Sequence, residues 1–159
     1  MVAGAVPTVN SYKVALLADL LCQAGEARVR VTGSSMLPAI WPADVITIRR
    51  RLVAEMRTGE IAVFTRDNRM FAHRVVAHTG AHVVTQGDTV PSPDAPVSDA
   101  ELLGVVVAVV RRGRHANVAA EPGVASRLVA AAARCSSRAN SMLQRARALT
   151  VQVLERSCR

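Results

Sequence analysis

The sequence predicts a mainly β domain, either a sheet or a barrel, with one helix before it and a basic amphipathic helix after it. Short apolar segments recur at regular spacing between residues 28 and 110, and turn residues separate them. On both sides of this region the apolar residues follow a helical period instead. Half of the 159 residues are hydrophobic but only 3% are aromatic, so we expect a core of Val, Leu, Ile and Ala in one domain.

The N-terminal segment, residues 1–26, predicts a loose tail followed by a short amphipathic helix. Asn10 or Ser11 can cap this helix, which runs to about Gln23 and stops at Gly25. Its apolar residues recur every three or four positions, at Val14, Leu16, Leu17, Leu20 and Leu21. One face of the helix is therefore expected to pack against the β body or a partner.

The central segment, residues 27–115, predicts the β domain. Turn signals bound its expected strands, which lie at 28–31, 45–49, 61–65, 70–78, 82–86 and 102–110. The turns between them carry Gly, Pro, Asn or Asp, each of which favours turn angles for its own reason. The last long loop, residues 87–96, contains three prolines and two aspartates, and the prolines stiffen it.

The C-terminal segment, residues 116–159, predicts a basic amphipathic helix. Its apolar stripe runs from Val124 to Val153, and a line of arginines lies beside the stripe at 127, 134, 138, 145 and 156. The helix either packs on the β body with a solvated arginine edge or lies on an anionic membrane surface, where arginine stems reach the phosphates. The net charge of +8 also suits nucleic acid, but the helix lacks interleaved aromatic residues, so we expect no specific nucleic-acid partner.

Cysteine spacing and apolar runs exclude several classes of protein. Cys22, Cys135 and Cys158 are far apart, so they suggest neither a zinc site nor a disulfide framework, and we expect no metal or cofactor. The first residues lack a secretory leader pattern, and the apolar runs are shorter than the roughly 18–20 residues that span a bilayer. We therefore expect a cytoplasmic or peripherally membrane-associated protein.

The segment Thr32-Gly33-Ser34-Ser35-Met36-Leu37-Pro38 can hold a serine in a tight turn. Glycine permits unusual backbone angles, and proline fixes its own φ. An exposed serine with a fixed direction suits a nucleophile, although serines beside glycine also make simple turns. A serine nucleophile needs a base, and Lys13, the only lysine, lies on the N-terminal helix before the β domain begins.

Among the four histidines, His73 is the candidate base. His78 and His82 flank a Thr-Gly turn, and His115 follows an arginine-rich turn, so we expect all three to be solvated. His73 lies in the middle of an expected strand, where its imidazole needs solvent or a polar partner. It is either a structural histidine with a satisfied hydrogen bond or a catalytic base.

A catalytic histidine needs a carboxylate that orients its ring and stabilises the imidazolium. Asp88 and Asp94 lie on the proline-stiffened loop after the next strand, which can return beside His73. Both aspartates could also cap simple turns. The order Ser, His, Asp along one β body is coherent, and the residues alone leave the choice between the two aspartates open.

Six segments resemble, in order, the boxes of the type I signal peptidase family. Residues 33–40 are similar to its G-x-S-M-x-P box, residues 43–45 to its G-D-x-V step, and residues 59–64 to its G-D-I-V-x-F strand. His73-Arg74-Val75 matches the H-R-V box of the endoplasmic-reticulum-type branch, which uses histidine where most bacterial enzymes use lysine. Residues 86–94 resemble that branch's K-G-D-N-N…D segment, and residues 103–106 its closing strand.

The resemblance implies a fold and a role for each residue. The fold would be the coiled sheet or β-barrel shared by signal peptidases and self-cleaving repressors. Ser35 would be the nucleophile, His73 the base and Asp94 the third member, with Asp88 in reserve as a structural group. The Ser35 N–H would stabilise the oxyanion, and Met36 would shape the turn. Gly33 replaces a serine that helps hold the oxyanion in many relatives, and Ser34 lies beside it, so the second oxyanion donor stays open.

We therefore expect a serine endopeptidase that hydrolyses a precursor or a leader or signal peptide through an acyl-enzyme. The family would imply small side chains at P1 and P3 of an extended substrate. The alternatives are a weak or inactive peptide-binding relative of the same fold and a basic nucleic-acid-binding protein. Self-cleaving repressor domains use a Ser/Lys dyad, which this chain lacks in its β domain.

Overall fold

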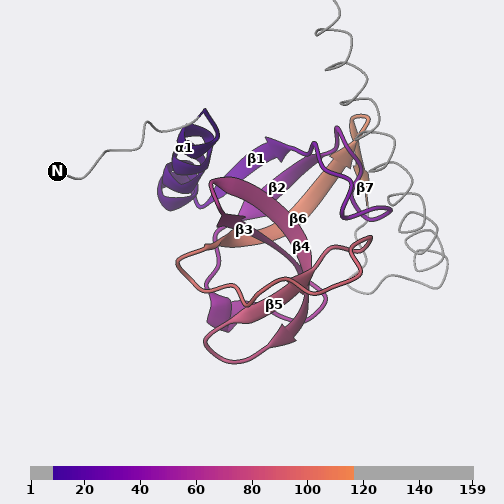
Figure 1. The fold of residues 1–159 in the computed structure, drawn as a ribbon. Helices are drawn as coiled ribbons and strands as arrows, with labels where there is room; N and C mark the ends of the chain where they lie inside the picture. The colour runs from indigo at the N-terminus through magenta and orange to yellow at the C-terminus, as the bar shows by residue number, and fades with distance from the viewer. Residues whose placement is uncertain (1–8, 117–159) are drawn as a thin grey trace, which may run out of the picture.

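A computed structural model describes residues 9–116, which form one helix and a seven-stranded sheet (Figure 1). The elements follow in the order α1 (Val9–Ala24), β1 (Glu26–Arg30), β2 (Val45–Arg49), a 3₁₀ turn η1 (Val53–Glu55), β3 (Ile61–Arg66), β4 (Arg69–His78), β5 (Val83–Gln86), β6 (Leu102–Arg111) and β7 (Arg114–Ala116).

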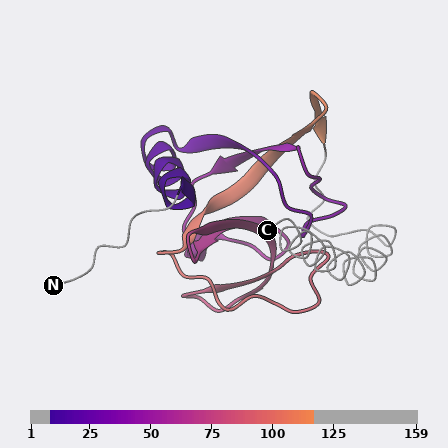
Figure 2. The same ribbon diagram turned by 45° about the horizontal axis from the view of Figure 1, so that its top comes forward.

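All strand pairs are antiparallel, and the sheet order is β1-β2-β6-β3-β4-β5, with β7 paired to β6. The long strand β6 therefore joins the β1-β2 half of the sheet to the β3-β4-β5 half. Figure 2 shows these two halves as an upper and a lower layer, so the sheet is coiled rather than flat.

Two apolar clusters fill the interior, one for each half of the coiled sheet. The first contains buried residues of β2, β3 and β6 together with Leu17 and Leu21 from α1 and Met36 and Ile40 from the loop after β1. The second lies under β3, β4 and β5 and includes Phe64 and Val97. Alternating burial on β2 confirms that one face of this strand is inward. Met36 and Ile40 thus anchor the loop after β1 in the apolar core.

The predicted fold class is confirmed: the body is an antiparallel sheet with one helix before it. The expected strand at 45–49 matches β2, and the expected helix lies within α1. Sequence periodicity missed β7 and η1, because three residues are too few to show a period. The predicted C-terminal helix, its membrane contact and the first residues of the tail lie outside the described residues.

Within residues 9–116, no helix is long and apolar enough to cross a membrane.

A partly buried ion pair fixes the turn that enters β2. Arg111, at the end of β6, donates hydrogen bonds to both carboxylate oxygens of Asp44, at 2.8–3.1 Å, and its Nη2 also reaches the carbonyl of Ala39. The Trp41 N–H donates to the same carboxylate at 2.8 Å. Burial alone would raise the pKa of Asp44, but the Arg111 hydrogen bonds, the Trp41 N–H and the Arg111 charge together lower it below its usual value.

We expect Asp44→Asn to cost about 1–3 kcal/mol of folding free energy at pH 7. Because the folded pKa lies below the unfolded one, the stabilisation is complete above the unfolded pKa and is lost as pH falls through the folded pKa. Urea unfolding at pH 7 and pH 3 should therefore show a smaller difference between variant and wild type at pH 3.

Glu26→Gln is the matched control, because Glu26 pairs with Arg49 on the surface at 2.6 Å. Exposed pairs of this kind contribute about 0–1 kcal/mol. An Asp44→Asn cost no larger than that of Glu26→Gln, or one that is equal at both pH values, would contradict the assignment.

Candidate active site

Ser35 lies in a turn that the core and a second loop hold from two sides. The next residue, Met36, is buried in the first apolar cluster, and its carbonyl accepts a hydrogen bond from the Ile40 N–H at 2.9 Å. The Ser35 carbonyl accepts hydrogen bonds from Thr89, from its N–H at 2.9 Å and its hydroxyl at 3.1 Å. These contacts fix the backbone of the turn, and with it the direction in which the Ser35 side chain points.

His73 lies on β4, opposite Ala62 of β3, and is buried. Its Nε2 is 3.0 Å from the Ser35 Oγ, and its Nδ1 is 2.7 Å from the Asp94 Oδ2. Phe64 and Phe71 pack around the ring, with centroids 6.0 and 5.9 Å from that of His73. The three side chains thus form one continuous hydrogen-bonded chain, Ser35-His73-Asp94.

Thr85 fixes Asp94 through both its backbone and its side chain. The Asp94 N–H donates to the Thr85 carbonyl at 2.7 Å, and the fully buried Thr85 hydroxyl donates to the Asp94 Oδ2 at 2.7 Å. A carboxylate oxygen only accepts hydrogen bonds, so the ring nitrogen that faces it carries the proton. In the neutral form of that tautomer, His73 Nε2 carries a lone pair toward the Ser35 hydroxyl, as a general base requires.

Asp88, the reserve aspartate, lies against Arg74 instead of His73. The Arg74 Nε and Nη2 donate to its two carboxylate oxygens, both at 2.9 Å, and Arg74 Nη1 donates to the Gly59 carbonyl at 2.8 Å. Both side chains are only 7% exposed. This buried two-point pair fixes the loop that begins at Gly87, and it leaves Asp94 as the carboxylate beside His73.

Gly87 permits the close approach of this loop to the other two groups. A Cβ at Gly87 would lie 3.0 Å from the Ser35 carbonyl oxygen and 3.1 Å from the His73 Nε2. Both separations are tighter than ordinary van der Waals contact. A side chain at this position would have to displace Ser35 and His73 by a few tenths of an ångström, so glycine fits where the Asp88 loop passes beside them.

A cleft of about 450 Å³ opens beside Ser35 and His73. It is lined by residues 29–36 from the end of β1 and the following loop, by residues 69–73 of β4, and by Ile40, Ile46, Val63 and Val90. Gly33, Ser34 and Met36, which the sequence associates with the oxyanion or substrate, all belong to this lining. Lys13 is exposed on α1 and does not line the cleft.

Sequence reasoning missed the residues that support the site from neighbouring elements. Thr85 and Arg74 are polar residues within strands, and both are buried, a combination that suggests a fixed polar partner. Thr89 gave no signal beyond its place in the loop. The remaining described histidines, His78, His82 and His115, are exposed, in agreement with the expectation that they are solvated.

Over residues 9–116, no group of three or more His, Cys, Asp or Glu side chains is arranged to hold a metal ion.

Comparison with known families gives a match over most of the β domain. The sequence model of the family described as Peptidase S24-like matches residues 3–107, about two thirds of the chain. A search of curated proteins finds no match.

Proposed function

The chain belongs to the Peptidase S24-like family, and on that premise we propose that it is a serine endopeptidase of the signal-peptidase type. Membership places it among serine peptidase-type hydrolases. The proposed reaction is hydrolysis of a peptide bond in a precursor or in a leader or signal peptide. The observation that carries the proposal is the hydrogen-bonded chain Ser35-His73-Asp94, with contacts of 3.0 and 2.7 Å at the edge of a cleft.

The proposed mechanism follows the directions of these hydrogen bonds. His73 Nε2 takes the hydroxyl proton as Ser35 Oγ attacks the scissile carbonyl carbon. Asp94 stabilises the imidazolium, which then gives the proton to the leaving amine as the C–N bond breaks. Water hydrolyses the resulting acyl-enzyme by the same proton transfers in reverse. The Ser35 N–H is our proposed oxyanion donor, and Gly33 and Ser34 border the same position.

Open strand edges on both sides of the cleft support an extended peptide as the substrate. Within the described sheet, β1 is an edge strand, since it pairs only with β2. On β4, pairing with β5 begins at Arg74, so residues 69–73 pair only with β3. A peptide between these two edges can add a strand to the sheet while its side chains enter the cleft. Small side chains at P1 and P3 are the specificity that the signal-peptidase resemblance implies.

The serine assignment is tested by peptide cleavage. Wild-type protein, Ser35→Ala and Ser34→Ala are incubated with Ala-x-Ala peptides, and products are followed by mass spectrometry. We expect Ser35→Ala to lose turnover, because no other hydroxyl lies 3.0 Å from His73 Nε2 among the described contacts. Ser34→Ala should keep most of the wild-type turnover. A partial loss in this variant would indicate that the Ser34 hydroxyl stabilises the oxyanion. Retained turnover in Ser35→Ala would exclude the mechanism.

A further inference from the structure

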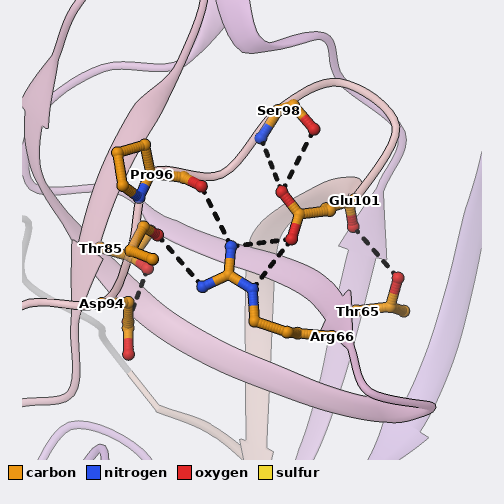
Figure 3. A network of polar contacts seen from close by, with 8 residues as sticks. Thr65, Arg66, Thr85, Asp94, Pro96, Ser98 and Glu101 are labelled. Carbon is orange, nitrogen blue, oxygen red and sulfur yellow. Dashed lines mark hydrogen bonds and ion pairs between the residues drawn. The ribbon is translucent and has the colours of Figure 1, made fainter.

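Few backbone hydrogen bonds hold the loop on either side of Asp94. Asp94 is held by Thr85, and the next backbone pairing is the Val97–Val83 bridge, at 2.8 and 3.0 Å. Between these points stand Ala95 and Pro96, and Figure 3 shows the Pro96 carbonyl directed toward the guanidinium of Arg66. Besides the two Thr85 hydrogen bonds, the position of Asp94 therefore depends on what holds these two carbonyls.

Arg66, the last residue of β3, holds both carbonyls. Its Nη1 donates to the Ala95 carbonyl at 3.2 Å, and its Nη2 donates to the Pro96 carbonyl at 3.0 Å. The guanidinium also lies over the Phe64 ring, 5.6 Å from its centroid, and Phe64 packs against His73. Arg66 thus connects the loop of Asp94 to the strand that pairs with the strand of His73.

Glu101 fixes the direction of the Arg66 guanidinium. Its Oε1 accepts hydrogen bonds from Arg66 Nε at 2.9 Å and Nη2 at 2.8 Å, while its Oε2 accepts from the N–H and hydroxyl of Ser98 at 3.1 and 3.2 Å (Figure 3). Burial would raise the pKa of Glu101, but the Ser98 N–H and the Arg66 hydrogen bonds and charge lower it below its usual value. The carboxylate is therefore anionic at neutral pH and holds the planar fork of Arg66 in place.

We propose that Arg66 and Glu101 are positioning residues for the reaction, because together they hold Asp94 at hydrogen-bond distance from His73. This inference rests on the proposed function. Neither residue lines the cleft, so their loss should leave substrate binding intact. Loss of the two carbonyl contacts should let the loop shift, and displacements of about 1 Å at a reacting group can cost about 100-fold in rate.

The test compares Arg66→Met with Arg51→Met. Arg51 forms a single ion pair with Glu60 at 2.7 Å, and its side chain is about as exposed as that of Arg66, 25% against 26%, but none of its described hydrogen bonds reaches the loop of Asp94. We expect Arg66→Met to lower kcat by about 10- to 100-fold with KM within about twofold. Arg51→Met should leave both within about twofold. Arg66→Lys keeps the charge but has no fork, so it should recover only part of kcat.

Proton NMR gives a second measurement that does not need turnover. The His73 Nδ1–H resonance depends on its hydrogen bond to Asp94, and we expect it to move upfield or broaden in Arg66→Met and Glu101→Gln but not in Arg51→Met. If wild-type protein cleaves no peptide, the proposed function fails, while this resonance still decides whether the two residues position Asp94. An unchanged resonance in Arg66→Met, or a kcat that falls no further than in Arg51→Met, would overturn the inference.

Discussion

Replacing His73 by alanine is expected to lower kcat/KM for peptide cleavage by at least about 10⁴-fold. Ser35 Oγ would lose the acceptor of its proton, 3.0 Å away, and the leaving amine would lose its proton donor. His82→Ala is the matched control, because His82 is exposed and does not line the cleft. It should change kcat/KM by less than about twofold.

Removing the imidazole also empties space beside Phe64 and Phe71, so His73→Ala could lose activity by unfolding. His73→Gln separates the two causes. The glutamine amide fills part of the space and can hydrogen-bond, but it cannot take up a proton at neutral pH. We expect this variant to melt closer to wild type than His73→Ala and to be equally inactive. Activity in His73→Gln within tenfold of wild type would exclude His73 as the base.

Gly104→Ala is expected to destabilise the fold strongly. Gly104 lies on β6 opposite Val63 of β3, and a Cβ there would lie 2.1 Å from the carbonyl oxygen of Arg49 at the end of β2. The conflict is with backbone, not with a flexible side chain. Because β6 pairs with β2 on one side and β3 on the other, it cannot move aside without breaking one ladder. We expect a cost of about 3 kcal/mol or more.

Gly113→Ala distinguishes this overlap from simple backbone strain. Gly113 has φ +78° in the turn between β6 and β7, and a Cβ there would meet nothing within 4 Å. Alanine in this left-handed conformation should cost about 1–2 kcal/mol. Urea unfolding measures both variants. A Gly104→Ala cost equal to or below that of Gly113→Ala would show that β6 does not pass Arg49 as described.

Local patterns were sufficient to predict most of the sheet. Along β2, buried residues alternate with less buried ones. The observed β4, Arg69–His78, begins one residue before its expected range of 70–78, and turn residues mark the ends of both strands. Ser35 and His73 were also predictable, because a serine turn after one strand and a histidine within another are local features. The choice of Asp94 over Asp88 was different. Both lie on one loop, and the residues alone do not say which one faces β4.

The groups that decide this choice come from distant parts of the chain. Arg74 forms an ion pair with Asp88, and the Thr85 hydroxyl donates a hydrogen bond to Asp94. Only the folded sheet creates these contacts. Arg66 and Glu101 are 35 residues apart, and charged residues at such separations are too common for their pairing to be predicted. Sequence spacing supplies the candidate side chains, and the register of β3, β4 and β5 determines which of them meet.

Covalent labelling of Ser35 tests the central claim most directly. A fluorophosphonate reacts with a serine only when a base activates it, so it needs no knowledge of the natural substrate. After incubation, digestion and mass spectrometry, we expect one phosphonyl adduct on Ser35, absent in Ser35→Ala and much slower to form in His73→Gln. An unlabelled wild-type protein, as expected of an inactive peptide-binding relative, or an adduct on Ser34 instead would contradict the assignment of Ser35 as the nucleophile.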